Sequence, residues 1–384
     1  MKNDCDICGA PAHGYHFGAM TCRACSAFFK RSLLTKSFRR SCKHNNNCID
    51  FTGIKNPPCK PCRLIKCLRM GMDSKNLKSA PSIRKSITSY QTSEYSSGKI
   101  SIITSNHRSF VDLNSLVFHA FETLDFGAPK MLNSNLTNLQ KMSLAYSESF
   151  EKLEKFHHLS RQKTLFLWER EFLSTAKWLS HFDKFTDLPR GLKMQLLQSI
   201  WHVWGRLNKV VKSADLRKQQ GRVSRNLLFC DKFYVEFENM TVDTTWISRH
   251  PVEQLRCFMD VSDTGWNLEP FIQTVLSLNL SKIELAYMSA QLCFQYAQNR
   301  FLGTELSSIC EKFLEIISND LHSYYMDSFG DMKNYAGRLA QMLKINRGIL
   351  TSIRELREMT KLAHTFDIYI ADFSHPEMFV DTGC

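Results

Sequence analysis

Apolar positions recur at spacings of three and four residues from about residue 130 to the C-terminus, which is the period of an amphipathic helix. Breaks rich in Ser, Asn, Asp, Gly and Pro separate the periodic segments. The pattern predicts helices over residues 141–159, 163–186, 191–213, 248–261, 281–297, 304–327 and 331–370. Within residues 222–240, large apolar side chains occupy mostly alternate positions, which predicts one short β-hairpin. Those side chains are Phe229, Phe233, Val235 and Phe237. We therefore expect a mostly α body, a layered helical bundle with one small β-hairpin.

Near the N-terminus, residues 22–34 form a shorter periodic segment with two contrasting faces. One face is apolar and contains Phe28, Phe29 and Leu33. The opposite face is small and basic and contains Arg23, Ser26, Ala27, Lys30 and Arg31. The pattern predicts a helix that packs through its aromatic side. Its basic side suits the major groove of DNA, where Arg and Lys donate to guanine N7 and O6. A basic face turned only to solvent is the alternative interpretation.

A second short helix is predicted over residues 60–70, ending before Gly71, a residue typical of helix C-termini. Its inward stripe consists of Leu64, Cys67 and Leu68. Its outward cations are Arg63, Lys66 and Arg69. We expect these cations to contact phosphate groups, which gives affinity without sequence information.

Between the N-terminal helices and the helical body, the composition changes. Residues 79–110 contain 13 Ser and Thr in 32 positions and few large apolar side chains. Such a segment cannot bury enough apolar surface to offset the entropy of ordering it. We therefore expect a flexible Ser/Thr-rich hinge over residues 79–130, between a small domain of residues 1–78 and a helical domain of residues 131–384.

The charge divides the chain in the same place. Residues 1–80 contain 15 Lys and Arg against 4 Asp and Glu, whereas the remaining residues contain 35 against 33. A basic block beside a near-neutral body indicates one domain that binds a polyanion and one with another role. No run of 18 apolar residues predicts a membrane span, and the N-terminus lacks the apolar core of a secretory signal.

Nine of the 14 cysteines lie within the first 67 residues. Eight of them form two modules, Cys5-x2-Cys8-x13-Cys22-x2-Cys25 and Cys42-x5-Cys48-x10-Cys59-x2-Cys62. A Cys-x2-Cys knuckle supplies two of the four thiolates that a tetrahedral zinc ion needs, and nothing indicates an oxidising compartment. We expect two Zn²⁺ ions that contribute much of the folding free energy of so short a domain. The ninth, Cys67, lies on an apolar helix stripe and is assigned to the core.

Two segments resemble the DNA-binding domain of nuclear hormone receptors. They are Cys-Arg-Ala-Cys-Ser-Ala-Phe-Phe-Lys-Arg over residues 22–31 and Cys-Lys-Pro-Cys-Arg-Leu-Ile-Lys-Cys-Leu-Arg-Met-Gly-Met over residues 59–72. The form Cys-Arg-Ala-Cys is similar to the expanded nematode receptors. The resemblance implies a nuclear transcription factor that binds a half-site in double-stranded DNA. Arg23 and Ser26 depart from it, because the family usually has Glu and Lys there, and residues 49–58 make one loop a residue longer than is common.

Residues 172–201 resemble the signature of the ligand-binding domain of the same family. The resemblance implies that Lys177 and Glu377 hold the two ends of a coregulator helix, and that Glu284 and Arg338 form a structural ion pair. It further implies a small lipophilic ligand and a homo- or heterodimeric partner. A short C-terminal helix is expected to begin at Pro376. The predicted inner face either lines a ligand pocket or packs as ordinary core. That face contains Trp168, Phe172, Thr175, Leu179 and Phe182.

Two other classes of function were weighed. A zinc-stapled protein-interaction module without sequence-specific DNA binding is the alternative, although such modules usually include His among their ligands. An enzyme is not expected, because the chain has no Gly-rich phosphate loop, no His-Glu-x-x-His segment and no nucleophile elbow. Closed four-cysteine sites also leave no open coordination position for catalysis.

Overall fold

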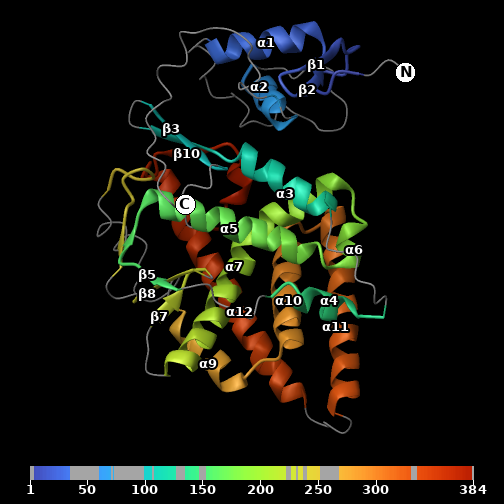
Figure 1. Ribbon diagram of the computed structural model, residues 1–384, viewed down its shortest axis with the longest axis vertical. Coiled ribbons are helices and arrows are strands. Elements are labelled where there is room, and N and C mark those ends of the chain that lie inside the picture. Colours follow the sequence, from blue (N-terminus) through green and yellow to red (C-terminus); the bar gives the residue numbers. More distant parts are fainter. Residues whose placement is uncertain are drawn as a thin grey trace. The chain divides into compact units, whose positions relative to one another are not determined.

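The computed structural model divides the chain into two compact units, Met1–Glu94 and Tyr95–Cys384 (Figure 1). It describes residues 4–34, 60–70, 72, 99–105, 108–126, 135–146, 153–221, 226–230, 232–236, 240–250, 268–329 and 335–382. Among the described helices, none combines the length and apolar character needed to cross a lipid bilayer.

The first unit is a hairpin followed by two short helices. Its elements are β1 (Gly14–His16), β2 (Ala19–Thr21), α1 (Arg23–Leu34) and α2 (Lys60–Arg69). β1 and β2 pair antiparallel, and the turn between them places Phe17 and Gly18 at positive φ. The core is small, because five cysteines and the two phenylalanines of α1 supply most of it. A domain with so little buried apolar surface needs an additional source of stability.

The second unit is mostly helical. Its helices are α3 (Asn114–Phe126), α4 (Asn138–Ser143), α5 (Arg161–Leu179), α6 (Asp183–Thr186), α7 (Arg190–Gln220), α9 (Glu269–Leu278), α10 (Lys282–Arg300), α11 (Glu305–Phe329) and α12 (Tyr335–Thr365), with a 3₁₀ turn η5 (Pro376–Met378). Its strands are β3 (Ser101–Ser105), β4 (Arg108–Asp112), β5 (Glu154–Lys155), β6 (His158–Leu159), β7 (Asn226–Leu228), β8 (Phe233–Glu236), β9 (Thr241–Val242) and β10 (Ala371–Phe373).

The helices of this unit pack in layers around α7 and α10. α5 packs on both α3 and α7, whereas α10 packs on α7, α11, α12 and α4 (Figure 1). α7 is buried over most of its surface, as expected for a helix enclosed by neighbours. Aromatic side chains fill the centre: Trp178 of α5 lies 6.2 Å from Trp204 of α7 and 6.5 Å from Phe294 of α10, measured between ring centroids.

The predicted ion pair between Glu284 and Arg338 is confirmed. Arg338 Nη2 donates to Glu284 Oε2 over 2.7 Å, and the Tyr325 hydroxyl donates to Glu284 Oε1 over 2.6 Å. Glu284 also closes a capping box with Ser281 at the start of α10. Although burial opposes the charged form, these hydrogen bonds lower the pKa of the Glu284 carboxyl. The pair therefore ties the first turn of α10 to α11 and α12.

Five of the predicted helical segments and the predicted hairpin are confirmed. The segments 191–213, 281–297, 304–327 and 331–370 correspond to α7, α10, α11 and α12, and 163–186 is divided into α5 and α6. β7 and β8 form the antiparallel hairpin, and Phe237 lies outside the described residues. For the segment 248–261, residues from 251 onward lie outside the described part of the chain.

The predicted helix over residues 141–159 is wrong. α4 ends at Ser143, and the end of the segment forms β5 and β6, which pair parallel with β8 and β9. Phe156 N donates to Tyr234 O over 3.1 Å, so its backbone is bonded to a distant strand rather than along a helix. Tertiary pairing has overridden the local apolar period.

The hinge predicted over residues 79–130 is wrong for its second half. β3 and β4 pair antiparallel there, and β10 joins β4 in parallel to form a three-stranded sheet. Val111, Leu113 and Leu116 are buried in the main core. Ser101, Thr104, Ser105 and Ser109 occupy strand positions in β3 and β4 beside a few apolar residues. The average composition of residues 79–110 therefore concealed the pattern. Residues 73–98 lie outside the described part.

Candidate metal centre and nucleic-acid interface

Four cysteines of the first unit come together at one buried site. The Sγ atoms of Cys5, Cys8, Cys22 and Cys25 all lie within 4.8 Å of one another, and Cys8 Sγ is 3.6 Å from Cys22 Sγ. Zinc–sulfur bonds of about 2.3 Å imply sulfur–sulfur separations of about 3.8 Å in a tetrahedron. The four thiols therefore fit a closed zinc site. The loop before β1 supplies two of them and the start of α1 the other two, so a bound ion would fix where α1 begins.

Arg63 of α2 lies against this site. Its Nη2 donates to Cys25 Sγ over 3.1 Å, and its guanidinium carbon lies 4.5 Å from the centroid of the Phe28 ring. Burial raises the pKa of the Cys25 thiol, and the nearby guanidinium opposes that shift. Arg63 is half-buried against the sulfur cluster and the aromatic ring. Its contact with phosphate stays a prediction.

Cys67 is confirmed as a core residue. Its side chain is fully buried on α2, among the same cluster that contains Phe28 and Phe29. Burial raises the pKa of the Cys67 thiol to about 12. Cys67 is not one of the four clustered cysteines.

The second predicted cysteine module lies outside the residues that the structure describes. Cys42, Cys48 and Cys59 lie outside the described residues, and so does the side chain of Cys62 in α2. Among the described residues one four-cysteine cluster is present. The second zinc site remains a prediction.

Both faces predicted for α1 are present as far as the structure describes them, since the side chain of Leu33 lies outside the described part. Phe28 and Phe29 are buried, whereas Arg23, Lys30 and Arg31 are exposed. Ala27 is also exposed and Ser26 is half-buried, so the small side chains lie on the basic face. On α2, Lys66 is half-buried, and the side chain of Arg69 lies outside the described part. The exposed face of α1 is thus basic, as predicted.

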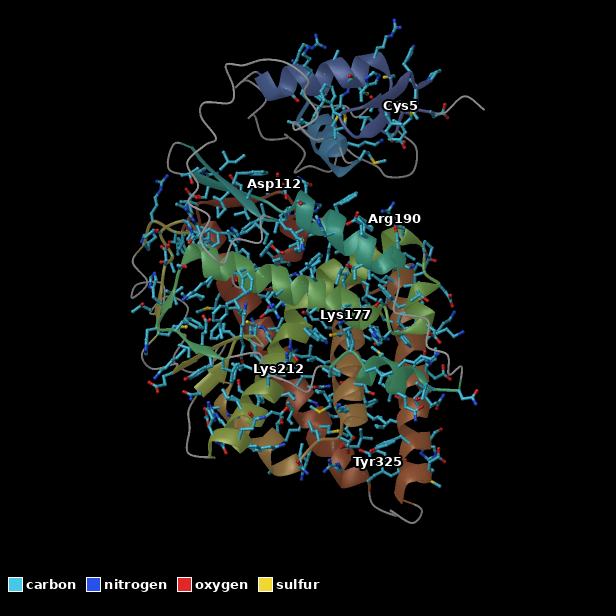
Figure 2. The ribbon with its side chains drawn as sticks, in the orientation of Figure 1. Cys5, Asp112, Lys177, Arg190, Lys212 and Tyr325 are labelled. Carbon is cyan, nitrogen blue, oxygen red and sulfur yellow. The ribbon has the colours of Figure 1, made fainter. Side chains whose placement is uncertain are left out.

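The second unit holds the two residues predicted to bind a coregulator. Lys177 is exposed near the C-terminal end of α5, where Figure 2 labels it. Glu377 lies in η5, a short helical turn that begins at Pro376 as predicted. Its Oε1 lies 3.0 Å from His375 Nδ1 and accepts from Gln198 Nε2 over 3.4 Å. The structure describes both residues and places them on separate elements, with no direct hydrogen bond or ion pair between them.

The C-terminal segment is held by a network that the sequence did not predict. Arg357 of α12 donates to Asp381 through Nε and Nη2, the latter over 2.6 Å, and the Tyr296 hydroxyl donates to the same carboxylate. Trp201 Nε1 donates to Met378 O over 3.1 Å, and Arg300 Nη2 donates to Glu377 O over 2.8 Å. An acidic residue in an apolar C-terminal stretch was the signal that could have revealed Asp381.

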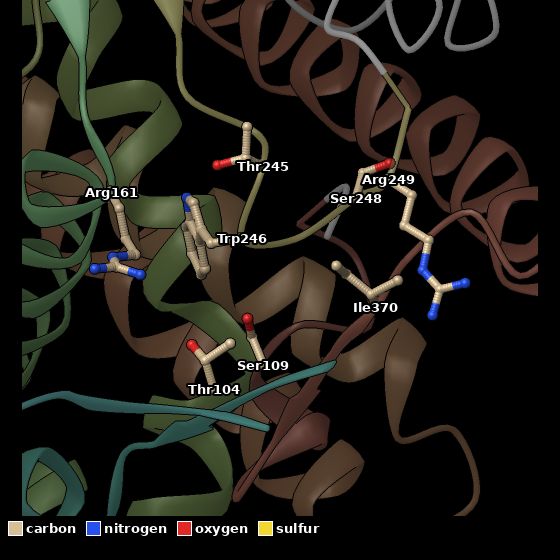
Figure 3. Close-up of a pocket in the computed structure, with 8 residues that line it drawn as sticks. All are labelled: Thr104, Ser109, Arg161, Thr245, Trp246, Ser248, Arg249 and Ile370. Atoms are coloured by element: carbon tan, nitrogen blue, oxygen red, sulfur yellow. The ribbon is translucent and has the colours of Figure 1, made fainter. Parts of the chain in front are cut away.

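The predicted inner face of α5 packs as core in the described structure. Trp168 lies 5.0 Å from Phe379 and Phe172 lies 6.2 Å from Trp201, between ring centroids. A cavity of about 330 Å³ lies elsewhere, beside the β3–β4–β10 sheet (Figure 3). It is lined by Thr104, Ser109, Arg161, Thr245, Trp246, Ser248, Arg249 and Ile370. Its lining combines hydroxyl and guanidinium groups with the apolar surface of Trp246 and Ile370.

Comparisons with known proteins agree with this geometry. Residues 3–74 match a family model described as a double treble clef zinc finger of the C4 type, and residues 149–366 match the ligand-binding domain of nuclear hormone receptor. Nuclear hormone receptor family member nhr-106 of Caenorhabditis elegans is 43% identical, covering 100% of both chains. Family member nhr-130 of the same organism is 36% identical, covering 99% of this chain and 92% of its own.

Proposed function

The chain belongs to the nuclear hormone receptor family and is a transcription factor of that type, and from this premise we propose that α1 reads the major groove of a DNA half-site. The observation that carries the proposal is the exposed basic face of α1, which begins directly at the four-cysteine site. We further propose a nuclear location, coregulator partners, and a second zinc ion held by Cys42, Cys48, Cys59 and Cys62.

In this proposal the first zinc ion is held by Cys5, Cys8, Cys22 and Cys25, and it supplies structural stability rather than chemistry. The buried Phe28 and Phe29 fix the rotation of α1, so Arg23, Lys30 and Arg31 turn outward together. Arg63 joins α2 to α1 through Cys25 and Phe28. Lys66 and Arg69, together with Arg63, are the proposed phosphate contacts of α2.

Substitutions on the two helices are expected to separate affinity from sequence preference. Lys30→Ala or Arg31→Ala should weaken discrimination by roughly 1–3 kcal/mol at one base pair. Lys66→Ala should weaken binding about equally for all sequences and reduce its salt dependence, because it removes one phosphate contact. Competition gel shifts at several salt concentrations measure both quantities. If all three variants change affinity and preference alike, the division into base and phosphate contacts is wrong.

Arg23 is expected to change which hexamer is preferred. It is exposed one helical turn before the half-buried Ser26. An Arg there donates to guanine but cannot accept from cytosine N4, as the Glu usual in the family can. Selection from a random DNA pool with the wild type and with Arg23→Glu should therefore give consensus sequences that differ at one base pair. Identical sequences from both proteins would instead make Arg23 a phosphate contact.

A further inference from the structure

Helix α3 lies along α5, and it spans the distance between the C-terminal segment and the start of α7 (Figure 1). Thirteen residues at 1.5 Å per residue give it a length of about 20 Å. Figure 2 labels Asp112 just before one end of α3 and Arg190, the first residue of α7, beside the other. Helix α3 thus covers α5 between the C-terminal segment and the start of α7.

The N-terminal end of α3 is joined to the C-terminal segment. Leu113 N donates to Ser374 Oγ over 2.9 Å. The His375 ring lies between two side chains, with Nε2 3.2 Å from Asn114 Oδ1 and Nδ1 3.0 Å from Glu377 Oε1. The His375 ring therefore links Asn114, the first residue of α3, to the Glu377 carboxylate, which is proposed to bind the start of a coregulator helix.

The C-terminal end of α3 is joined to α7. The Arg190 guanidinium carbon lies 4.4 Å from the centroid of the Phe121 ring, and Arg190 Nη2 lies 3.4 Å from Asp125 Oδ2. A short connection that contains α6 joins α5 to Arg190. This end of α3 therefore contacts the helix that comes after Lys177 in the chain.

The underside of α3 is an apolar stripe. Leu116, Ala120 and Leu124 are spaced four residues apart and buried, and Val117 lies beside them. Ser115, Phe118 and Glu122 on the opposite side are exposed. A short amphipathic helix with apolar anchors at such spacing, laid against other helices, is a recurring mode of peptide recognition.

We propose that α3 occupies, within the same chain, the surface of α5, α7 and η5 on which a partner's amphipathic helix docks. The inference rests on the proposed coregulator binding through Lys177 and Glu377. A partner helix binds this surface by displacing α3, so affinity for the partner includes the cost of lifting α3 from α5. Any change that weakens the packing of α3 on this surface, and leaves the surface itself intact, therefore raises the affinity for the partner helix.

The test uses the full chain and a fluorescein-labelled synthetic peptide of residues 112–127 as the probe. Phe121→Ala with Asp125→Arg removes both contacts of α3 to Arg190 without altering α5, α7 or η5. We expect the double variant to bind the probe about tenfold more tightly than the wild type, since an exposed ion pair and a cation–π contact are lost. Fluorescence anisotropy measures the affinity.

Glu122→Arg is the matched control, because it makes the same charge change on the exposed side of α3. It should bind the probe as the wild type does. Hydrogen exchange provides a second measurement that does not depend on any substitution: saturating probe should accelerate exchange of residues 114–126 in the wild type. The inference is overturned if the probe fails to bind, binds all three proteins equally, or leaves α3 protected.

Failure of this inference is distinguishable from failure of the proposed function. Gel shifts on the same three proteins report DNA binding by the first unit, and none of the substitutions lies there. Intact DNA binding with no effect on the probe contradicts only the placement of α3. Loss of DNA binding by the wild type contradicts the proposed function.

Discussion

Removal of zinc is expected to unfold the first unit and to abolish DNA binding, while the helices of the second unit remain. Structural zinc sites contribute on the order of 10–16 kcal/mol to the folding of short domains. The core of the first unit consists of a few side chains around four thiols, so it has no comparable alternative. Native mass spectrometry, hydrogen exchange of α1 and gel shifts in a strong chelator measure the three consequences.

A pair of cysteine substitutions provides the control. Cys22→Ser removes one of the four clustered thiols, whereas Cys230→Ser changes a half-buried cysteine of the second unit. The first should reproduce the effect of the chelator, and the second should bind DNA normally. Protected amides in α1 after complete removal of zinc would show that the metal is dispensable for this fold.

Asp381→Ala is expected to lower the free energy of unfolding of the second unit by about 3 kcal/mol, the lower end of the range for breaking a buried pair, because Arg357 is one-third exposed. The Asp381 side chain is fully buried and accepts hydrogen bonds from Arg357 and Tyr296. Urea denaturation measures the loss, and hydrogen exchange should show residues 371–382 opening first. Asp372→Ala, in an exposed pair with Arg108, should cost less than about 1 kcal/mol.

The same carboxylate gives a pH dependence of known sign. Burial opposes ionisation, but the hydrogen bonds from Arg357 and Tyr296 outweigh it and lower the pKa of Asp381. A carboxyl with a lowered folded-state pKa stabilises the fold above its unfolded pKa of about 3.9, and this stabilisation is lost as the pH falls through the folded value. Wild type and Asp381→Ala should therefore converge in stability below about pH 4. Equal differences at pH 7 and pH 3 would contradict this account.

Much of the fold was predictable because the apolar spacing of a long helix repeats over many turns. The apolar spacing repeats over several turns in each of the long helices α7, α10, α11 and α12. In contrast, β5 and β6 are two residues long and are defined by strand partners about 80 residues away. Sequence spacing contains no information about such partners. Helix α3 was missed because the Ser and Thr count covers residues 79–110, and the predicted hinge was extended from there to residue 130 over a segment that contains only Ser115 and Thr123 in α3.

The candidate site divides in the same way. Cysteine spacing placed Cys5, Cys8, Cys22 and Cys25 together, because a knuckle is a local structure and zinc demands four ligands. Helical spacing also gave the correct faces of α1. It gave no sign of the contacts of Arg63 with Cys25 and Phe28, because those two residues belong to another helix.

The parallel pairing of β4 with β10 ties the first strands of the second unit to its last residues. About 260 residues separate the paired positions, and ribosomes add roughly 5–20 residues per second, so β4 must wait some 13–50 s for its partner during synthesis. Until then one edge of β4 has no partner strand, and an unpaired edge can pair with another chain. A chain that stopped before residue 371 would lack β10 and would keep that edge of β4 open.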